Sequence, residues 1–147
     1  MTDGDAAAAR PETAFLVLAG TDGPDVDEAV TVRVRYERAY VLVTVAGEVD
    51  FGSVARLRER LFGLAAAGRP LVADLDRVSF IDAAGLGALA GAAWQAAAHG
   101  ASLRVVCARP RIRRLFRLTG LDQAVSLAGT LDEALGMLAS AAKAEAV

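Results

Sequence analysis

The 147-residue sequence predicts an α/β domain: a mixed, mainly parallel β-sheet covered by about four α-helices, with an antiparallel hairpin at its N-terminal side. Two observations favour this fold class. Before residue 50, two strand-like runs are separated only by Glu37, Arg38 and Ala39, and a link this short requires antiparallel pairing. After residue 50, helical and strand-like stretches alternate regularly, which is typical of parallel strands joined by helices.

Residues 1–29 are expected to form an N-terminal tail, and residues 30–147 the folded domain. Residues 1–11 contain nothing large enough to bury, so this part should not pack against the domain. Residues 14–19 differ, because they contain a run of large apolar side chains, from Phe15 to Leu18. This run can form a short accessory strand before the turn-rich residues 20–24.

The first half of the domain begins with the hairpin. Residues 30–36 alternate apolar and polar side chains, so one side of this strand should face the core and the other the solvent, with residues 40–45 as its partner. Ser53 is the expected N-cap of a helix that Gly68 ends. The buried stripe of that helix is expected to consist of Val54, Leu57, Leu61 and Leu64. Residues 71–75 are almost continuously apolar, which predicts a central strand buried on both faces.

Glycine and proline punctuate the second half of the chain, where helices and strands continue to alternate. The elements expected there are a helix from Asp82 to about Gly100, a strand at 103–107, a helix from Pro110 to Gly120, a strand at 124–127, and a final helix that opens with a Thr130–Glu133 capping box.

Composition and charge exclude several classes of function. Sixteen basic against eighteen acidic residues leave a net charge of −2, so we expect no nucleic-acid partner and no membrane insertion. Cys107 is the only cysteine, which excludes an internal disulfide and fits a reducing compartment. Residues 1–12 lack a secretion signal, and the weakly polar stretch 83–98 is too short to span a bilayer. We therefore expect a soluble, cytoplasmic protein.

The residues that could support catalysis or bind a cofactor are sparse. One histidine and one cysteine cannot form a metal site, and His99 stands at an expected helix end, where an imidazole often caps carbonyls. No serine lies in a nucleophile elbow, so we expect no enzyme and no cofactor. Residues 85–90 formally match a dinucleotide fingerprint. However, Asp82 intrudes at the turn, and the chain is too short for two nucleotide-binding halves.

The candidate site lies within residues 71–89, where a strand is followed by a helix. Asp82 precedes two alanines and two closely spaced glycines, so the first helical turn offers free backbone N–H groups beside little side-chain bulk. Such a helix start either binds an anion or lets another protein approach closely. The same helix should present a flat outer face to a partner helix, with Trp94 as an anchor at its margin. That face is expected to contain Ala84, Gly87, Ala88, Gly91, Ala92 and Gln95, with Leu86, Leu89, Ala90, Ala93 and Ala97 toward the core. Composition bias, or shielding by another part of the chain, would explain the small residues equally well.

Three motifs carry a resemblance to a known family. They are Gly47-Glu48-Val49-Asp50, then Val78-Ser79-Phe80-Ile81-Asp82-Ala83-Ala84-Gly85-Leu86-Gly87, then Pro110-Arg111-Ile112-Arg113-Arg114-Leu115-Phe116 through Thr119-Gly120-Leu121. Their order and spacing resemble the STAS domain of bacterial anti-sigma factor antagonists, over about residues 30–141. The resemblance implies a STAS-like fold and a regulator that binds an anti-sigma factor that is also a serine kinase. A homodimer is left open.

The resemblance also implies a contact centre and a switch. The expected partner-binding residues are Asp50, Asp82, Ala83, Ala84, Gly85, Leu86, Gly87 and Gly91. In the family, the kinase phosphorylates a serine directly after the aspartate and thereby releases the antagonist. This chain has Ala83 at that position and Ala84 after it, and neither can accept phosphate. Ser79 could be offered as a substitute, although a structural role at the strand end fits it better.

The sequence leaves several functional interpretations open. The alanines either hold the domain in its binding-competent state, as a constitutive antagonist or a scaffold subunit of a larger STAS assembly, or mark a regulatory role that has been lost. The alternative function is a STAS module that binds a nucleotide or a lipid at the same helix start. The third helix carries Arg111, Arg113, Arg114 and Arg117, which form either a solvated face or a contact for an acidic partner.

Overall fold

The computed structural model describes residues 15–16 and 30–146. The expected accessory strand is present in part, at Phe15 and Leu16, and the rest of residues 14–19 lies outside the described ranges, as does most of the expected tail. The elements are β1 (Phe15–Leu16), β2 (Val30–Tyr36), β3 (Val41–Val49), α2 (Val54–Ala65), β4 (Leu71–Ile81), α3 (Ala83–Ala98), β5 (Leu103–Val106), α4 (Pro110–Leu118), the 3-10 helix η2 (Leu121–Gln123), β6 (Ser126–Ala128) and α5 (Leu131–Ala146).

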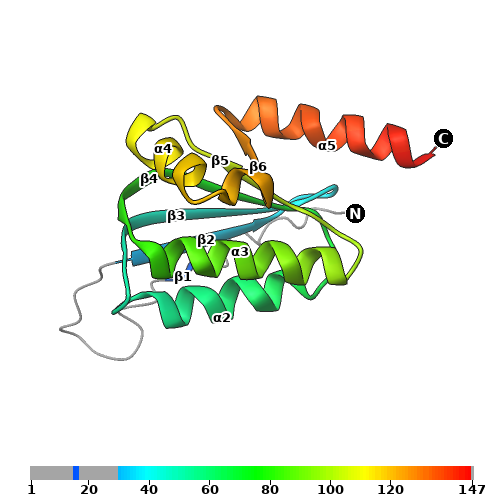
Figure 1. The fold of residues 1–147 in the computed structure, drawn as a ribbon. Helices are drawn as coiled ribbons and strands as arrows, with labels where there is room; N and C mark the ends of the chain where they lie inside the picture. The colour runs from blue at the N-terminus through cyan, green and yellow to red at the C-terminus, as the bar shows by residue number, and fades with distance from the viewer. Residues whose placement is uncertain (1–14, 17–29, 147) are drawn as a thin grey trace.

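The strands form one mixed sheet in the order β1-β2-β3-β4-β5-β6 (Figure 1). β1 and β2 pair antiparallel, as do β2 and β3, whereas β3 to β6 pair in parallel. The hairpin is in register from Val30 opposite Gly47 to Tyr36 opposite Val41. The predicted fold class, with its N-terminal antiparallel hairpin, is therefore confirmed.

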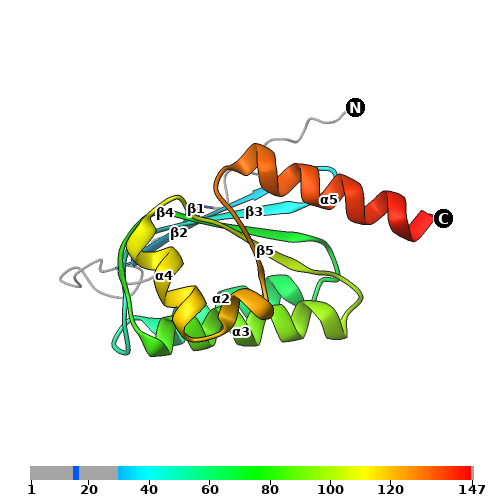
Figure 2. The ribbon, with the colours of Figure 1, turned by 45° about the horizontal axis from the view of Figure 1, so that its top comes forward.

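Helices cover the two faces of the sheet unequally. The larger core joins one face to α2, α3 and α4, with Leu61, Leu89 and Phe116 among its fully buried side chains. On the opposite face a smaller cluster around Val72 and Ala134 packs only α5 against the sheet. Figures 1 and 2 show α2 and α3 together on one side and α5 on the other. Among residues 15–16 and 30–146, no element covers the part of that second face where the groove residues of β2, β3 and β4 lie.

β4 is much longer than the predicted strand at residues 71–75, because it continues to Ile81. The predicted strand ended too early because the polar residues Asp76 and Arg77 follow its apolar run. Polar residues are compatible with the strand because Asp74 and Arg77 line a groove on the open part of the sheet face. The last strand also begins later than predicted, at Ser126, and Cys107 lies just beyond β5.

Most predicted helix ends hold, but the capping contacts differ in detail. Gly120 follows α4 in the left-handed region at φ 78°. His99 Nδ1 lies 2.9 Å from the carbonyl oxygen of Gln95, which confirms its capping role. Thr130 accepts the N–H of Glu133 as a capping box requires, yet the Glu133 carboxylate accepts from Gly129 N, one residue before the expected position. In residues 15–16 and 30–146, no helix has the length and hydropathy that a bilayer crossing needs.

Candidate functional site

The candidate site lies where the parallel strands β3 and β4 end and α3 begins. Val49 at the end of β3 is paired with Ile81 at the end of β4. The next residue, Asp82, donates its backbone N–H to Val49 O at 3.1 Å. The start of α3 is therefore fixed to the end of β3, a neighbouring strand that is distant in sequence.

The carboxylate of Asp82 joins two segments. Asp82 is the N-cap of α3, and its Oδ1 accepts the N–H of Gly85 at 3.1 Å. Its Oδ2 accepts the N–H of Phe51, also at 3.1 Å, from the loop between β3 and α2. One side chain thus caps the helix and holds the neighbouring loop against it.

Asp50 and Ser53 stabilise that loop from within. Asp50 Oδ1 accepts from Ser53 N at 3.1 Å, and Ser53 Oγ accepts from Asp50 N at 3.1 Å. Ser53 Oγ also donates to Glu48 O at 3.0 Å. α2 begins at Val54, as the N-cap prediction requires, but the Ser53 side chain bonds the loop instead of the helix. Asp50 therefore lies at the site, in a loop held by its own hydrogen bonds.

Gly85 and Leu86 lie beneath the surface and secure α3 to the sheet. A Cβ on Gly85 would lie 2.7 Å from side-chain atoms of both Val49 and Ile81, so only glycine lets the first turn approach the strand ends this closely. Leu86 is buried in the main core. These two predicted contact residues act as supports of the site, underneath its exposed part.

The exposed part of the α3 start is small and smooth. Ala83 and Gly87 are exposed and Ala84 is partly so. A Cβ on Gly87 would meet nothing within 4 Å. Below, the helix-start surface means Phe51, Asp82, Ala83, Ala84 and Gly87.

The wider flat face that we expected on α3 is partly wrong. Ala88 and Ala92 are buried, whereas Ala97 is exposed. The reason is α2, which packs alongside α3: a Cβ on Gly91 would lie 2.6 Å from Cζ of Phe62. Much of the small-residue face is therefore an internal helix–helix contact. The small residues were explained either by composition bias or by shielding within the chain, and for Gly91 the second explanation is correct.

Large apolar side chains stand exposed at this site and farther along α3. Phe51 is 83% exposed and Trp94, on α3, is 78% exposed. Phe80, paired with Glu48 at the end of β4, is half-exposed. Trp94 was predicted from the sequence as an exposed anchor, whereas Phe51 and Phe80 were not. An aromatic residue within the Asp50–Ser53 turn was the available signal, because turns rarely bury a large side chain.

The carboxylates of Asp50 and Asp82 are already hydrogen-bonded within the chain. Within the described ranges, no group of His, Cys, Asp and Glu could hold a metal ion. The Asp82 carboxylate already occupies the place where a helix start would receive an anion. Ser79 lies within β4, where its Oγ is 3.4 Å from Gly47 O.

The arginines of α4 divide into structural and exposed ones. Arg113 donates from Nη1 to Cys107 O at 2.9 Å, so it stabilises the turn before its own helix. Arg111, Arg114 and Arg117 are exposed. Whether they contact an acidic partner stays a prediction.

The fold described above is that of a known domain family. The family model of the STAS domain matches residues 30–134. The chain therefore belongs to the STAS domain family, a class defined by this mixed sheet and its helices.

Two relatives with known names are antagonists of anti-sigma factors. The chain is similar to the anti-sigma-B factor antagonist of Bacillus subtilis (strain 168), with 35% identity over 98 residues, covering 67% of this chain and 90% of the relative. It is 32% identical over 110 residues to the anti-sigma-F factor antagonist RsfB of Mycobacterium tuberculosis, covering 74% and 88%.

A solved structure extends the likeness to three dimensions. The crystal structure of an anti-sigma factor antagonist from Mycobacterium paratuberculosis superposes with a TM-score of 0.68 at 33% identity, covering 74% of this chain and 93% of that one. SpoIIAA in its unphosphorylated form, at 22% identity and a TM-score of 0.62, shares the fold.

Proposed function

We propose that this chain is an anti-sigma factor antagonist that binds an anti-sigma factor of the serine-kinase class through the helix-start surface, in the cytoplasm and without catalysis of its own. The observation that carries the proposal is the open start of α3, where Ala83 and Gly87 are exposed and Asp82 is hydrogen-bonded to the backbone of the exposed Phe51. A partner can approach the backbone closely there and bury an aromatic side chain. The names of the relatives support an anti-sigma factor as the partner.

The hydrogen bonds of Asp82 favour tight binding because they fix the surface in advance. Phe51 lies in a loop that Asp82 and Ser53 hold in place, so little conformational freedom is lost when the partner docks. An exposed aromatic ring on a held loop is the kind of side chain that dominates interface energies. Asp50 flanks the same loop.

The absence of a hydroxyl at residues 83 and 84 bears on regulation. A phosphate would bring about −1.5 to −2 charges next to the carboxylate of Asp82, and would repel a partner packed on this surface. Ala83 and Ala84 keep the position neutral. We propose that the chain stays in the binding-competent state and acts as a constitutive antagonist, or as a scaffold subunit in a larger STAS assembly.

Binding of a nucleotide or a lipid phosphate at this helix start is the less favoured function. The Asp82 carboxylate accepts the N–H of Gly85, a donor that a phosphate would need, and its charge repels a second anion. A protein partner needs neither the N–H of Gly85 nor a negative charge at this position.

The test is the affinity of the purified chain for a kinase-type anti-sigma factor from the same organism, measured by calorimetry with and without ATP. The proposal expects binding that survives incubation with ATP, with no phosphate on residues 83–89 by mass spectrometry. A chain that binds a nucleotide and none of the anti-sigma factors of its organism would overturn it.

A further inference from the structure

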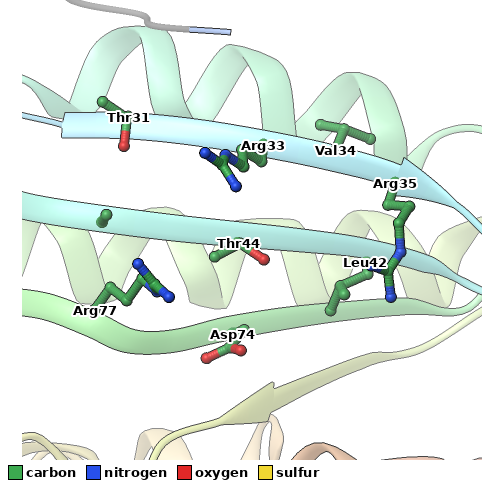
Figure 3. Close-up of a pocket in the computed structure, with 9 residues that line it drawn as sticks. Thr31, Arg33, Val34, Arg35, Leu42, Thr44, Asp74 and Arg77 are labelled. Atoms are coloured by element: carbon green, nitrogen blue, oxygen red, sulfur yellow. The ribbon is translucent and has the colours of Figure 1, made fainter. Parts of the chain in front are cut away.

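A polar groove lies on the part of the sheet that α5 leaves open. Its volume is about 750 Å³, and it is lined by side chains of β2, β3 and β4 (Figure 3). Side chains alternate between the faces of a strand, so Thr44 lies on the same face as Leu42, which packs on the α5 side. The groove is thus separate from the main core and from the helix-start surface.

Strand register places the groove residues in rows across the sheet. In one row Arg33 lies opposite Thr44, which lies opposite Asp74. In the next row Thr31 lies opposite Ala46, which lies opposite Arg77. Adjacent strands are about 4.8 Å apart, so the strands of the two arginines are separated by about 10 Å. Small side chains on β3 therefore form the floor, with an arginine on either side, as Figure 3 shows for Arg33, Thr44 and Arg77.

An irregularity in β4 puts Arg77 on this face. From Thr44 to Ala46 β3 advances by two residues, while β4 advances by three, from Asp74 to Arg77. Regular alternation would have placed Asp76 opposite Ala46. Instead, Asp76 Oδ1 accepts the N–H of Ala108 at 2.7 Å, at the loop after β5. The bulge thus removes a carboxylate from the groove and aims a guanidinium into it, a recurrent use of β-bulges at binding sites.

The arginines of the groove differ in how far they are already engaged. Arg35 is paired with Glu37 at 2.6 Å, and Arg33 has a polar or electrostatic partner within the chain. Among the described residues, the Arg77 guanidinium has no hydrogen-bond or ion-pair partner. A guanidinium has five N–H donors, so one group can bond to a partner within the chain and to a ligand at the same time. Asp74 accepts from Asp76 N at 2.9 Å through Oδ1, which leaves Oδ2 for a further bond.

We propose that this groove binds the phosphate groups of a small phosphorylated metabolite, no larger than a nucleotide, between Arg77 and Arg33. Guanidinium groups recognise phosphate by paired charged hydrogen bonds, and the hydroxyls of Thr31 and Thr44 add neutral donors. Asp74, at the edge of the same floor, accepts a hydroxyl or amine of the ligand. A groove of about 750 Å³ has the size of a small-molecule site.

The test is calorimetric titration of the whole chain with inorganic pyrophosphate and with ADP at low ionic strength. Arg77→Gln should weaken pyrophosphate binding by about tenfold or more, because a charged hydrogen-bond partner is lost. Asp74→Asn should strengthen it, because a like charge leaves the groove. Arg114→Gln, which removes the same charge at an exposed position of α4, is the matched control and should change binding by less than about twofold.

Several outcomes would overturn the proposal. The first is that neither pyrophosphate nor ADP binds. The second is that Arg77→Gln and Arg114→Gln weaken binding equally. The third is that the chain binds only phosphatidylglycerol vesicles, which would make the groove a lipid contact. Thermal unfolding confirms that each variant is folded. Affinity for the anti-sigma factor should not change in Arg77→Gln, because Arg77 is outside the helix-start surface, so this inference and the proposed function fail separately.

Discussion

The carboxylate of Asp82 accepts the backbone N–H of Phe51 at 3.1 Å, across 31 residues of sequence. The same carboxylate caps α3 through Gly85. One residue therefore sets both the position of the helix and the position of the exposed aromatic side chain beside it. This relationship makes the two parts of the helix-start surface depend on each other.

Replacing Asp82 should affect stability and binding together. Asp82→Ala removes the N-cap and the bond to Phe51, with an expected loss of about 1–2 kcal/mol in the free energy of unfolding. Asp82→Asn keeps an oxygen acceptor for only one of the two N–H groups and should lose less. Urea denaturation measures both, and Asp132→Ala, which removes an exposed carboxylate from α5, is the control. Equal stability of Asp82→Ala and the parent chain would refute the capping role.

Two glycines of α3, two residues apart, should respond to alanine in opposite directions. Gly85→Ala places a Cβ 2.7 Å from Val49 and Ile81 atoms and should cost about 1–3 kcal/mol. Gly87→Ala enters open space and should stabilise the helix by about 0.5–1 kcal/mol. Thermal denaturation of both variants checks this. If Gly85→Ala is neutral, the close approach of α3 to the strand ends is not what requires glycine.

A hydroxyl at residue 83 should restore a covalent switch. Ala83→Ser places the acceptor at the exposed start of α3, and phosphorylation there would add charge beside Asp82. We expect the variant to be phosphorylated by the kinase-type partner and released, while the parent chain stays bound. Ala97→Ser, at the exposed far end of the same helix, should not be modified. Phosphorylation of the parent chain at Ser79, followed by release, would contradict constitutive binding.

The single thiol should be inert in the folded state. Burial raises the pKa of Cys107, so the folded chain holds that proton more tightly than the unfolded chain does. The contribution of this thiol to the free energy of unfolding is therefore complete below the ordinary pKa of a thiol, and it is lost as the pH rises through the raised pKa of the folded state. Between neutral and alkaline pH, the free energy of unfolding measured by denaturation should decrease less for Cys107→Ala than for the parent chain. Rapid reaction of native Cys107 with a thiol reagent would show that it is not buried.

The fold could be predicted because its signals are strong. The alternation of residues 30–36 and the short link to residue 40 specify the hairpin, and Gly120 marks a left-handed turn that ends α4. The prediction ended β4 too early because the polar residues Asp76 and Arg77 resemble the end of a strand. The bulge lets Asp74 and Arg77 occupy one face of the strand. Pattern alone cannot show a bulge, since the extra residue reverses the alternation after it.

The site was only partly predictable, for a reason that lies in the composition of α3. Alanine and glycine give this helix almost no contrast between an apolar and a polar face, so the sequence does not say which side packs. Phe62, on another helix, decides this by covering Gly91. The place of Phe51 next to the start of α3 depends on a bond to Asp82 that no local pattern encodes. The helix start itself was found because Asp82 and the small residues after it are local signals.

The most direct measurement is the affinity of a kinase-type anti-sigma factor for Gly87→Gln, compared with Gly136→Gln. Both glycines are exposed helix positions where a Cβ meets nothing within 4 Å, so the two substitutions should affect folding alike. Gly136 lies on α5, whereas Gly87 lies in the helix-start surface. We predict that Gly87→Gln weakens binding by about tenfold or more and that Gly136→Gln changes it by less than about twofold. Equal affinity of the two variants would contradict a binding site at the start of α3.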